Sequence, residues 1–135
     1  MRVAVIGAGP KGLFAVERLL SHAPSSDLAI DLYDPQPPGH GAAYATSQPE
    51  HLRLNVNASI VDAGWHDGPA PSPDWVISFA NWRLAGGEDE PLEPFPPRAR
   101  VGAYLGDLFD ALREHHPGLR HVQRAVTTIT RRHHG

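Results

Sequence analysis

The sequence contains no cysteine, which excludes disulfide bonds, a thiolate nucleophile and a zinc–thiolate site. It also lacks a long apolar run. No segment approaches the roughly 18 residues of a transmembrane helix, and the apolar stretch after Arg2 is too short for a signal peptide. A strong charge of one sign is missing as well, since the net charge is −3. These absences predict a soluble cytoplasmic protein whose partners include neither nucleic acid nor a membrane.

Two other kinds of site have little support in the sequence. Among the nine histidines, His115, His116 and His121 have no carboxylate at a fixed ligand spacing, so we predict no metal site. No serine is accompanied by a base and an orienting acid, and we therefore identify no catalytic residue in the chain itself. A length of 135 residues predicts a single domain over residues 1–135.

The chain starts with a strand–helix–strand pattern. The β-branched run "VAVI" at 3–6 predicts a buried strand that ends at Gly7. Pro10 fits the first turn of a helix, apolar residues follow at helical spacing, and Pro24 closes the helix. Alternating apolar residues at 28–34 predict a second strand. This is the size of one βαβ unit, and it predicts an α/β fold of the Rossmann-like class with a parallel sheet.

The rest of the chain predicts a long insertion, two helices and a third strand. Residues 35–72 are rich in Pro, Gly, Ser and His, which is typical of an ordered functional loop. The next expected element is a helix that starts at Pro73, has Ser72 as its N-cap and stops at Gly86 and Gly87. A linker at 88–97 then leads to a helix with an apolar face that runs from Val101 to His115. The chain is expected to end with a strand at 121–130 and a frayed tail at 131–135. We expect the sheet order 3-2-1 and an incomplete doubly wound domain with an inserted loop and helical segment.

Gly7, Gly9 and Gly12 follow the first strand and open the first helix with the spacing G-x-G-x-x-G. The first glycine permits a tight turn, the second lets the backbone approach a pyrophosphate, and the third lets helix and strand pack closely. The amides of Lys11 and Gly12 are the expected phosphate donors, because Pro10 has no N–H. The spacing therefore predicts a site for a dinucleotide.

An acidic residue ends the second strand where this motif requires one. Asp34 stands 22 residues after Gly12 and is expected to accept hydrogen bonds from ribose hydroxyls. An acid at this position disfavours a 2′-phosphate, so NADP is not expected here. The glycines by themselves do not choose between FAD and NAD.

Five blocks of the chain resemble, in order, those of a family of FAD/NAD(P)-binding flavoproteins. They read "GAGPKGL" at 7–13, "DP" at 34–35, "GHGAAY" at 39–44, "HLRLNV" at 51–56 and "PRARVGAYL" at 97–105. The resemblance implies FAD, with its pyrophosphate on the first block, its adenosine ribose at the acid and its isoalloxazine ring near the middle loop. The site residues expected from the motif and the resemblance are Gly7, Gly9, Pro10, Lys11, Gly12, Asp34, Pro35, Gly41, Tyr44, His51, Leu54, Asn55, Val56 and Arg98.

The resemblance also indicates what else the protein needs. Members of the family run to several hundred residues, include oxidases, hydroxylases and amine N-monooxygenases, and usually take NAD(P)H as reductant at a second nucleotide site. We therefore expect this chain to be the N-terminal FAD-binding portion of a flavin-dependent oxidoreductase, inactive without a C-terminal half or a second chain. Two alternatives stay open, namely a non-catalytic nucleotide-binding module and a fragment of an NAD-binding dehydrogenase.

Overall fold

Short strands and helices joined by long loops make up the chain. The computed structural model describes residues 1–23, 27–88 and 90–131. The expected helix end at Pro24 and the expected fraying of 132–135 lie outside the described residues. The elements in chain order are β1 (Arg2–Ile6), α1 (Pro10–His22), β2 (Ala29–Tyr33), η1 (Ala58–Ile60), α2 (Phe79–Ala85), α3 (Arg98–His115) and β3 (Leu119–Val122).

The three strands run parallel and lie in the order β1-β2-β3. Val3 pairs with Ile30, and Ile30 pairs in turn with Leu119. The predicted parallel sheet is confirmed, and so is the expected order, in which the third strand lies beside the second. β2 is therefore the central strand of the described sheet.

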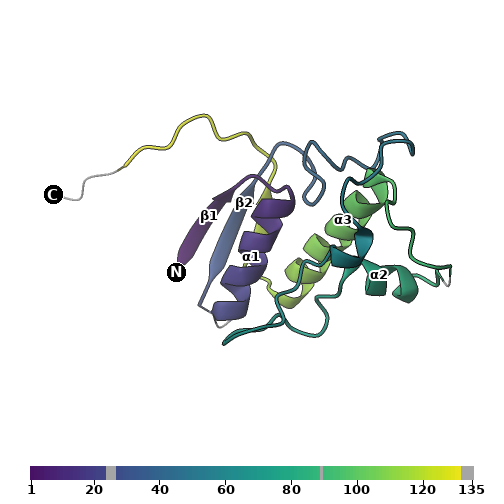
Figure 1. Ribbon diagram of the computed structural model, residues 1–135. Coiled ribbons are helices and arrows are strands. Elements are labelled where there is room, and N and C mark those ends of the chain that lie inside the picture. Colours follow the sequence, from purple (N-terminus) through teal and green to yellow (C-terminus); the bar gives the residue numbers. More distant parts are fainter. Residues whose placement is uncertain (24–26, 89, 132–135) are drawn as a thin grey trace.

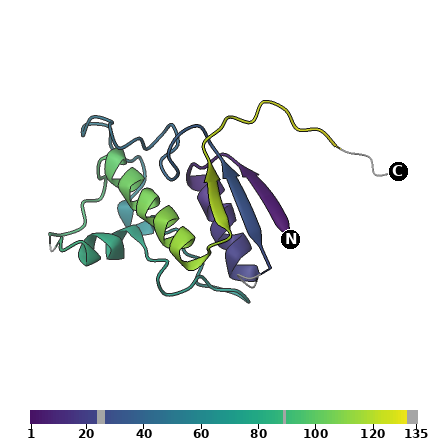
Figure 2. The same cartoon turned by 180° about the vertical axis from the view of Figure 1, so that it is seen from behind.

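Helices cover one face of this sheet. α1 crosses in front of the strands in Figure 1 and lies behind them in Figure 2. α3 packs beside α1 and against β3. Ile30 and Leu32 of β2 have no exposed surface and belong to the same core as Leu13 and Val16 of α1. The apolar spacing along α1 therefore matches the alternation along β2, as a βαβ unit requires.

The other face of the sheet carries charge in place of a helix. On the face turned to the viewer in Figure 2, no described helix crosses the strands. Asp31 of β2 is 7% exposed, and its carboxylate lies 3.3 Å from Arg2 Nε of β1 and 2.8 Å from Arg120 Nη2 of β3. One carboxylate thus links all three strands.

The helix expected from Pro73 begins instead at Phe79. Ser78, and not Ser72, is its N-cap, and the Ser78 hydroxyl accepts a hydrogen bond from the Asn81 amide at 3.2 Å. The prediction of this helix start was wrong by six residues.

Long-range hydrogen bonds explain the later start. The Ser72 hydroxyl donates to Glu17 Oε1 at 2.7 Å and accepts from Arg18 Nη2 at 2.9 Å, so it is engaged with α1. The Ile77 carbonyl accepts from the Tyr104 hydroxyl at 2.8 Å. These contacts hold the segment 72–77 on a non-helical path, and tertiary structure overrides the local helical spacing.

The third strand covers Leu119–Val122 and not 121–130. β2 offers backbone partners only from Ile30 to Tyr33, and Pro35, which has no N–H, follows closely. Residues 123–131 form no strand and extend away from the sheet in Figures 1 and 2. The β-branched pattern of 121–130 therefore lacks a partner strand among the described residues.

The insertion at 35–72 is ordered by hydrogen bonds to the linker before α3. The Leu54 amide donates to the Pro96 carbonyl at 3.0 Å, and the Arg98 amide donates to the Leu52 carbonyl at 2.8 Å. Within the insertion, η1 is the one helical element and no strand is present among these described residues. The expected ordered loop is confirmed.

A buried carboxylate fastens the end of this insertion to α1. Glu17 is 2% exposed and accepts hydrogen bonds from Ser21 Oγ at 2.7 Å, Ser72 Oγ at 2.7 Å and Arg18 Nε at 2.6 Å. Arg18 also donates to the Ala70 carbonyl at 2.8 Å. Burial raises the pKa of Glu17, but these hydrogen bonds outweigh it and lower the pKa below its usual value.

Acid is expected to weaken the contact between Glu17 and the end of the insertion. Because the pKa of Glu17 is lower in the folded state, its charge stabilises the fold above its usual pKa of 4.5, and this stabilisation is lost as the pH falls through the folded pKa. Glu17→Gln removes the charge at every pH, and we expect it to lower the free energy of unfolding at neutral pH by about 1–3 kcal/mol. Urea unfolding followed by tryptophan fluorescence, from neutral to acid pH, measures both effects.

The matched control is Glu114→Gln, which removes an exposed carboxylate from α3. We expect it to leave the free energy of unfolding and its acid dependence unchanged. Equal acid sensitivity in the wild type and Glu17→Gln would show that another group causes the acid dependence.

Candidate functional site

The turn between β1 and α1 has the geometry that its glycines predict. Gly7 has a φ of +97°, in the left-handed region, and its amide donates to the Tyr33 carbonyl of β2 at 2.8 Å. A Cβ on Gly12 would lie 1.8 Å from the Gly7 carbonyl oxygen, so no side chain fits there. The expected tight turn and the close packing of helix and strand are confirmed.

The first turn of α1 leaves backbone amides available to an anion. Gly9 is the N-cap, and the Leu13 amide bonds to the Gly9 carbonyl at 3.0 Å. The amides of Lys11 and Gly12 precede Leu13 and have no partner four residues earlier within the helix. The first turn itself contains no acidic residue that would offset the partial positive charge of about one half at a helix N-terminus.

The 39–44 loop forms a second wall beside this turn. Gly39 has a φ of +110°, and its amide donates a hydrogen bond to the Ala8 carbonyl at 2.7 Å. Gly41 has a φ of +51°, and a Cβ on it would lie 3.2 Å from the Gly9 Cα. The backbones of the loop and the turn therefore approach each other directly, and the glycines of "GHG" at 39–41 and "GAG" at 7–9 allow this approach.

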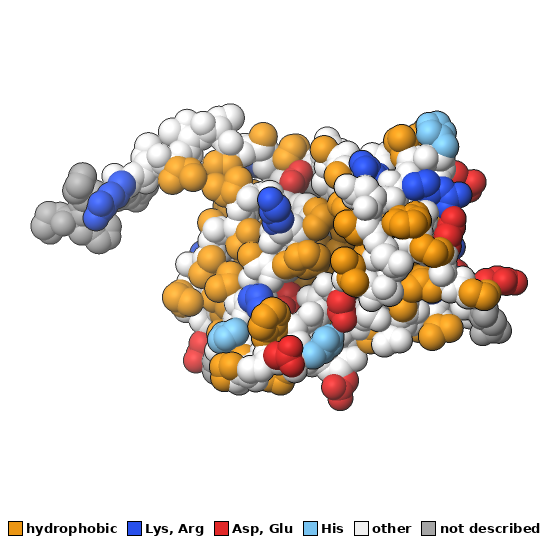
Figure 3. Space-filling model, viewed as in Figure 1, with side chains coloured by type: hydrophobic (Ala, Val, Ile, Leu, Met, Phe, Trp, Pro, Cys, Tyr) orange, Lys and Arg blue, Asp and Glu red, His pale blue; other side chains and the backbone are white. Residues whose placement is uncertain are grey.

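A cavity of about 620 Å³ lies between the turn and the loop. This volume is within the usual range of small-molecule sites. Figure 3 shows hydrophobic side chains gathered in a hollow beside α1 on this face of the molecule. The cavity is lined by Ile6, Gly7, Gly9, Pro10, Lys11, Gly12, Phe14, His40, Gly41, Ala42, Ala43 and Tyr44.

The lining contains a large part of the site that the sequence predicts, namely Gly7, Gly9, Pro10, Lys11, Gly12, Gly41 and Tyr44. Sequence reasoning missed Ile6, Phe14, His40, Ala42 and Ala43 as site residues. Two of these had a local signal: Phe14 stands one helical turn after Pro10, and Ile6 is the last residue before Gly7.

A smaller cavity of about 220 Å³ adjoins the first and shares Pro10, Phe14 and Tyr44 with it. The predicted residues Leu54 and Val56 lie in its wall. Its lining is largely apolar and includes one carboxylate. The remaining lining residues are Ile60, Val61, Asp62, Val101 and Leu105.

Asp34 lies after the end of β2 and braces the glycine turn. Its Oδ2 accepts a hydrogen bond from the Ala8 amide at 2.8 Å, and its Oδ1 accepts one from the Gln36 amide at 2.8 Å. The side chain is half-buried and does not line the large cavity. A carboxylate has about four acceptor positions, so both oxygens retain capacity for further donors.

Besides Asp34, four predicted residues line neither cavity. Pro35, His51 and Asn55 are exposed to solvent and line neither of the two cavities. Arg98 donates from Nε to the Arg53 carbonyl at 2.9 Å and so holds the facing loop. A direct contact of these four residues with a cofactor stays a prediction.

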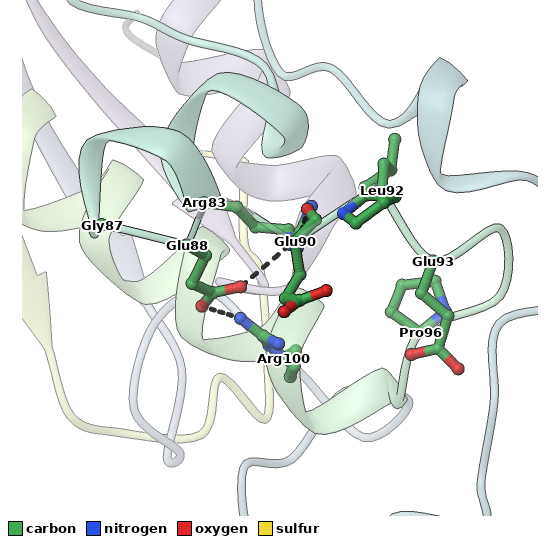
Figure 4. A pocket seen from close by; sticks show the side chains of 9 residues that line it. Arg83, Gly87, Glu88, Glu90, Leu92, Glu93, Pro96 and Arg100 are labelled. Carbon is green, nitrogen blue, oxygen red and sulfur yellow. Dashed lines mark hydrogen bonds and ion pairs between the residues drawn. The ribbon is translucent and has the colours of Figure 1, made fainter.

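A further cavity of about 560 Å³ shares no lining residue with the other two. Figure 4 shows that Arg83 of α2 and Arg100 of α3 both reach the carboxylate of Glu88. Arg83 is 7% exposed, its Nε lies 2.9 Å from Glu88 Oε2, and its Nη2 donates to the Glu90 carbonyl at 3.2 Å. This charge cluster ties α2, the linker and the start of α3 together, and no predicted site residue lines the cavity.

Among the residues that the structure describes, no helix is both long and apolar enough to cross a membrane. Over the same residues, no group of three or more His, Asp or Glu side chains is arranged to hold a metal ion. The lining of the large cavity consists of glycines, mainly apolar side chains, Lys11 and His40.

Known proteins are similar to this chain over most of its length. Nitrosuccinic acid synthase npaA of Aspergillus oryzae is 32% identical over 144 residues, which cover 93% of this chain and 21% of that protein. An L-aspartate N-monooxygenase (nitrosuccinate-forming) of Streptomyces davaonensis is 35% identical over 130 residues, covering 80% of this chain and 20% of that protein. The chain thus spans about a fifth of the length of these relatives. The sequence profile of the FAD-NAD(P)-binding family matches residues 4–135, and the chain belongs to that family.

Proposed function

We propose that the chain binds FAD in the cavity between the glycine turn and the 39–44 loop. The observation that carries this proposal is the direct approach of the two backbones, since Gly41 faces Gly9 at a distance that leaves little room for side chains. A helix N-terminus with available amides and no acid suits a pyrophosphate. The residues proposed to hold the pyrophosphate and the adjoining part of FAD are Gly7, Gly9, Pro10, Lys11, Gly12, Gly41 and Tyr44.

The adenosine ribose of FAD is proposed to lie at Asp34. The Ala8 and Gln36 amides, each at 2.8 Å, already orient the carboxylate. Its remaining lone pairs would accept hydrogen bonds from the ribose hydroxyls. A 2′-phosphate would meet this carboxylate as a like charge, which supports FAD over NADP at this site.

The flavin end is proposed to extend toward the smaller cavity. Phe14 and Tyr44 line both cavities, and Leu54 and Val56 line the smaller one. Such apolar walls suit an aromatic ring system. When bound, FAD supplies the redox chemistry, while the residues of the chain position the cofactor and exclude water from it.

The whole protein is proposed to be a flavin-dependent N-monooxygenase that uses NAD(P)H as reductant. Support comes from the family and from relatives named for aspartate N-oxygenation and nitrosuccinic acid synthesis. The proposed substrate class is the amino group of a small acidic amino acid. This chain would be the N-terminal FAD-binding part, acting in the cytoplasm. The NAD(P)H site and the catalytic groups would come from a C-terminal part or a second chain.

The alternatives are a non-catalytic nucleotide-binding module and an NAD-binding dehydrogenase fragment. Visible absorption separates them from the proposal, because bound FAD makes the purified protein yellow. A colourless chain that binds NAD or another adenine nucleotide but not added FAD would favour one of the alternatives.

Replacing Gly9 with valine is expected to weaken FAD binding at least tenfold, or about 1.4 kcal/mol. A Cβ at this position would lie 3.6 Å from the Gly41 Cα, which is ordinary contact, so the chain is expected to fold. The two further methyl groups of valine would occupy space between the turn and the loop. Isothermal titration calorimetry with FAD measures the affinity, and urea unfolding checks that the variant is folded.

Ala85→Val is the control, because it adds methyl groups at an exposed residue at the end of α2, outside the cavity. It should bind FAD as the wild type does. Equal affinity of the wild type and Gly9→Val would mean that FAD binds elsewhere.

A further inference from the structure

We infer that Gly102 of α3 is a positioning residue that sets the width of the cofactor cavity by letting the 39–44 loop lie directly on the helix. This inference rests on the proposed FAD site. It concerns a residue that does not itself line the cavity.

Gly102 is buried where α3 meets the loop backbone. A Cβ on Gly102 would lie 1.9 Å from the Tyr44 carbonyl oxygen and 3.2 Å from the His40 Cβ. Contacts of a Cβ below 3.0 Å are essentially never found, and here the neighbour is backbone, which cannot rotate away as the end of a side chain can. The loop therefore occupies its place only because residue 102 has no side chain.

The far side of the same loop faces the glycine turn. A Cβ on Gly41 would lie 3.2 Å from the Gly9 Cα and 3.8 Å from the Pro10 Cδ. The Gly39 amide is fixed to the Ala8 carbonyl at 2.7 Å. The loop is thus held between two backbones, and a shift away from α3 moves it toward the turn.

The residues at the Gly102 contact are themselves cavity residues. His40 and Tyr44 line the large cavity, and Tyr44 also lines the smaller one. A methyl group at position 102 would displace this wall toward Pro10 and Phe14 and narrow the space for FAD. The affinity for FAD therefore depends on a glycine on the far side of the wall.

Gly106 supplies a matched control on the same helix. It stands one turn after Gly102, and a Cβ on it would meet nothing within 4 Å. Replacing either glycine with alanine raises the intrinsic helix propensity by the same amount. The two substitutions therefore differ in whether the new methyl group meets the loop.

The test compares the wild type, Gly102→Ala and Gly106→Ala. FAD titration by flavin fluorescence gives the apparent dissociation constant. Urea unfolding without ligand gives the fraction of folded protein, and the dissociation constant is corrected for this fraction. We expect Gly106→Ala to bind within about twofold of the wild type and Gly102→Ala to bind at least tenfold more weakly after this correction. A merely structural role of Gly102 would lower stability but leave the corrected constant unchanged.

If Gly102→Ala is unfolded in buffer, the titration is repeated with trimethylamine N-oxide, which favours compact states.

A corrected affinity of Gly102→Ala within twofold of the wild type would overturn the inference. So would a variant that stays unfolded in the osmolyte, because the glycine would then serve the fold and not the cavity. A wild-type chain that binds no FAD would instead refute the proposed function, and this inference with it.

Discussion

Replacing Gly12 with alanine is expected to destabilise the protein by about 3 kcal/mol or more and to remove FAD binding with it. The new Cβ would lie 1.8 Å from the Gly7 carbonyl oxygen and 2.9 Å from the Gly7 carbonyl carbon. Relief requires α1 to move away from β1, which would open the core around Leu13 and Leu32. Urea unfolding followed by tryptophan fluorescence measures the loss of stability.

Gly9→Ala is the matched control in the same turn. Its Cβ would lie 3.6 Å from the Gly41 Cα, which is an ordinary contact. We expect its free energy of unfolding to stay within about 1 kcal/mol of the wild type, since glycine and alanine differ little where no contact is strained. Wild-type stability of Gly12→Ala would contradict the close packing of turn and helix.

The second large effect concerns catalysis by the 135-residue chain. With added FAD, we expect it to oxidise NADH no faster than free FAD does. A doubly wound sheet binds its ligands in a crevice between two halves, and the described strands make up one half. The relatives are about five times as long, which supports placing the second nucleotide site outside this chain. Steady-state absorbance at the NADH band measures the rate.

Two controls make this result decisive. Free FAD at the same concentration sets the baseline, and Gly9→Val tests whether any excess rate depends on the cavity. Turnover well above the baseline that disappears in Gly9→Val would show that the chain is a complete catalyst. Turnover that persists in Gly9→Val would show that it does not arise at this cavity.

Local patterns determined the first half of the fold and the centre of the site. β1, α1 and β2 could be predicted because strand alternation, helical spacing and the position of Pro10 act within a few residues. Gly7 and Gly12 could be assigned their roles because the turn is built from neighbours in the sequence, and the structure bears out both. The long apolar face of α3 could also be predicted, because its apolar residues recur at helical spacing over several turns.

Tertiary structure decided the features that depend on contacts between distant residues. Ser72 has the local character of a helix cap, but a carboxylate 55 positions away takes its hydroxyl, and α2 starts later. The β-branched residues after Val122 have the propensity of a strand, but a strand needs a partner, and β2 has already ended.

The position of the 39–44 loop, the second wall of the large cavity, also depends on contacts between residues that are distant in the sequence. The sequence shows the glycines of the 39–44 loop and of α3, but not that Gly39 lies against Gly106 and Gly102 against Tyr44. Helical spacing and glycine content describe single elements, whereas the distance between two backbones is set by how the whole core packs. The sequence therefore determined the glycine turn that bounds one side of the large cavity, and the packing of α3 on the 39–44 loop decided where the opposite wall lies.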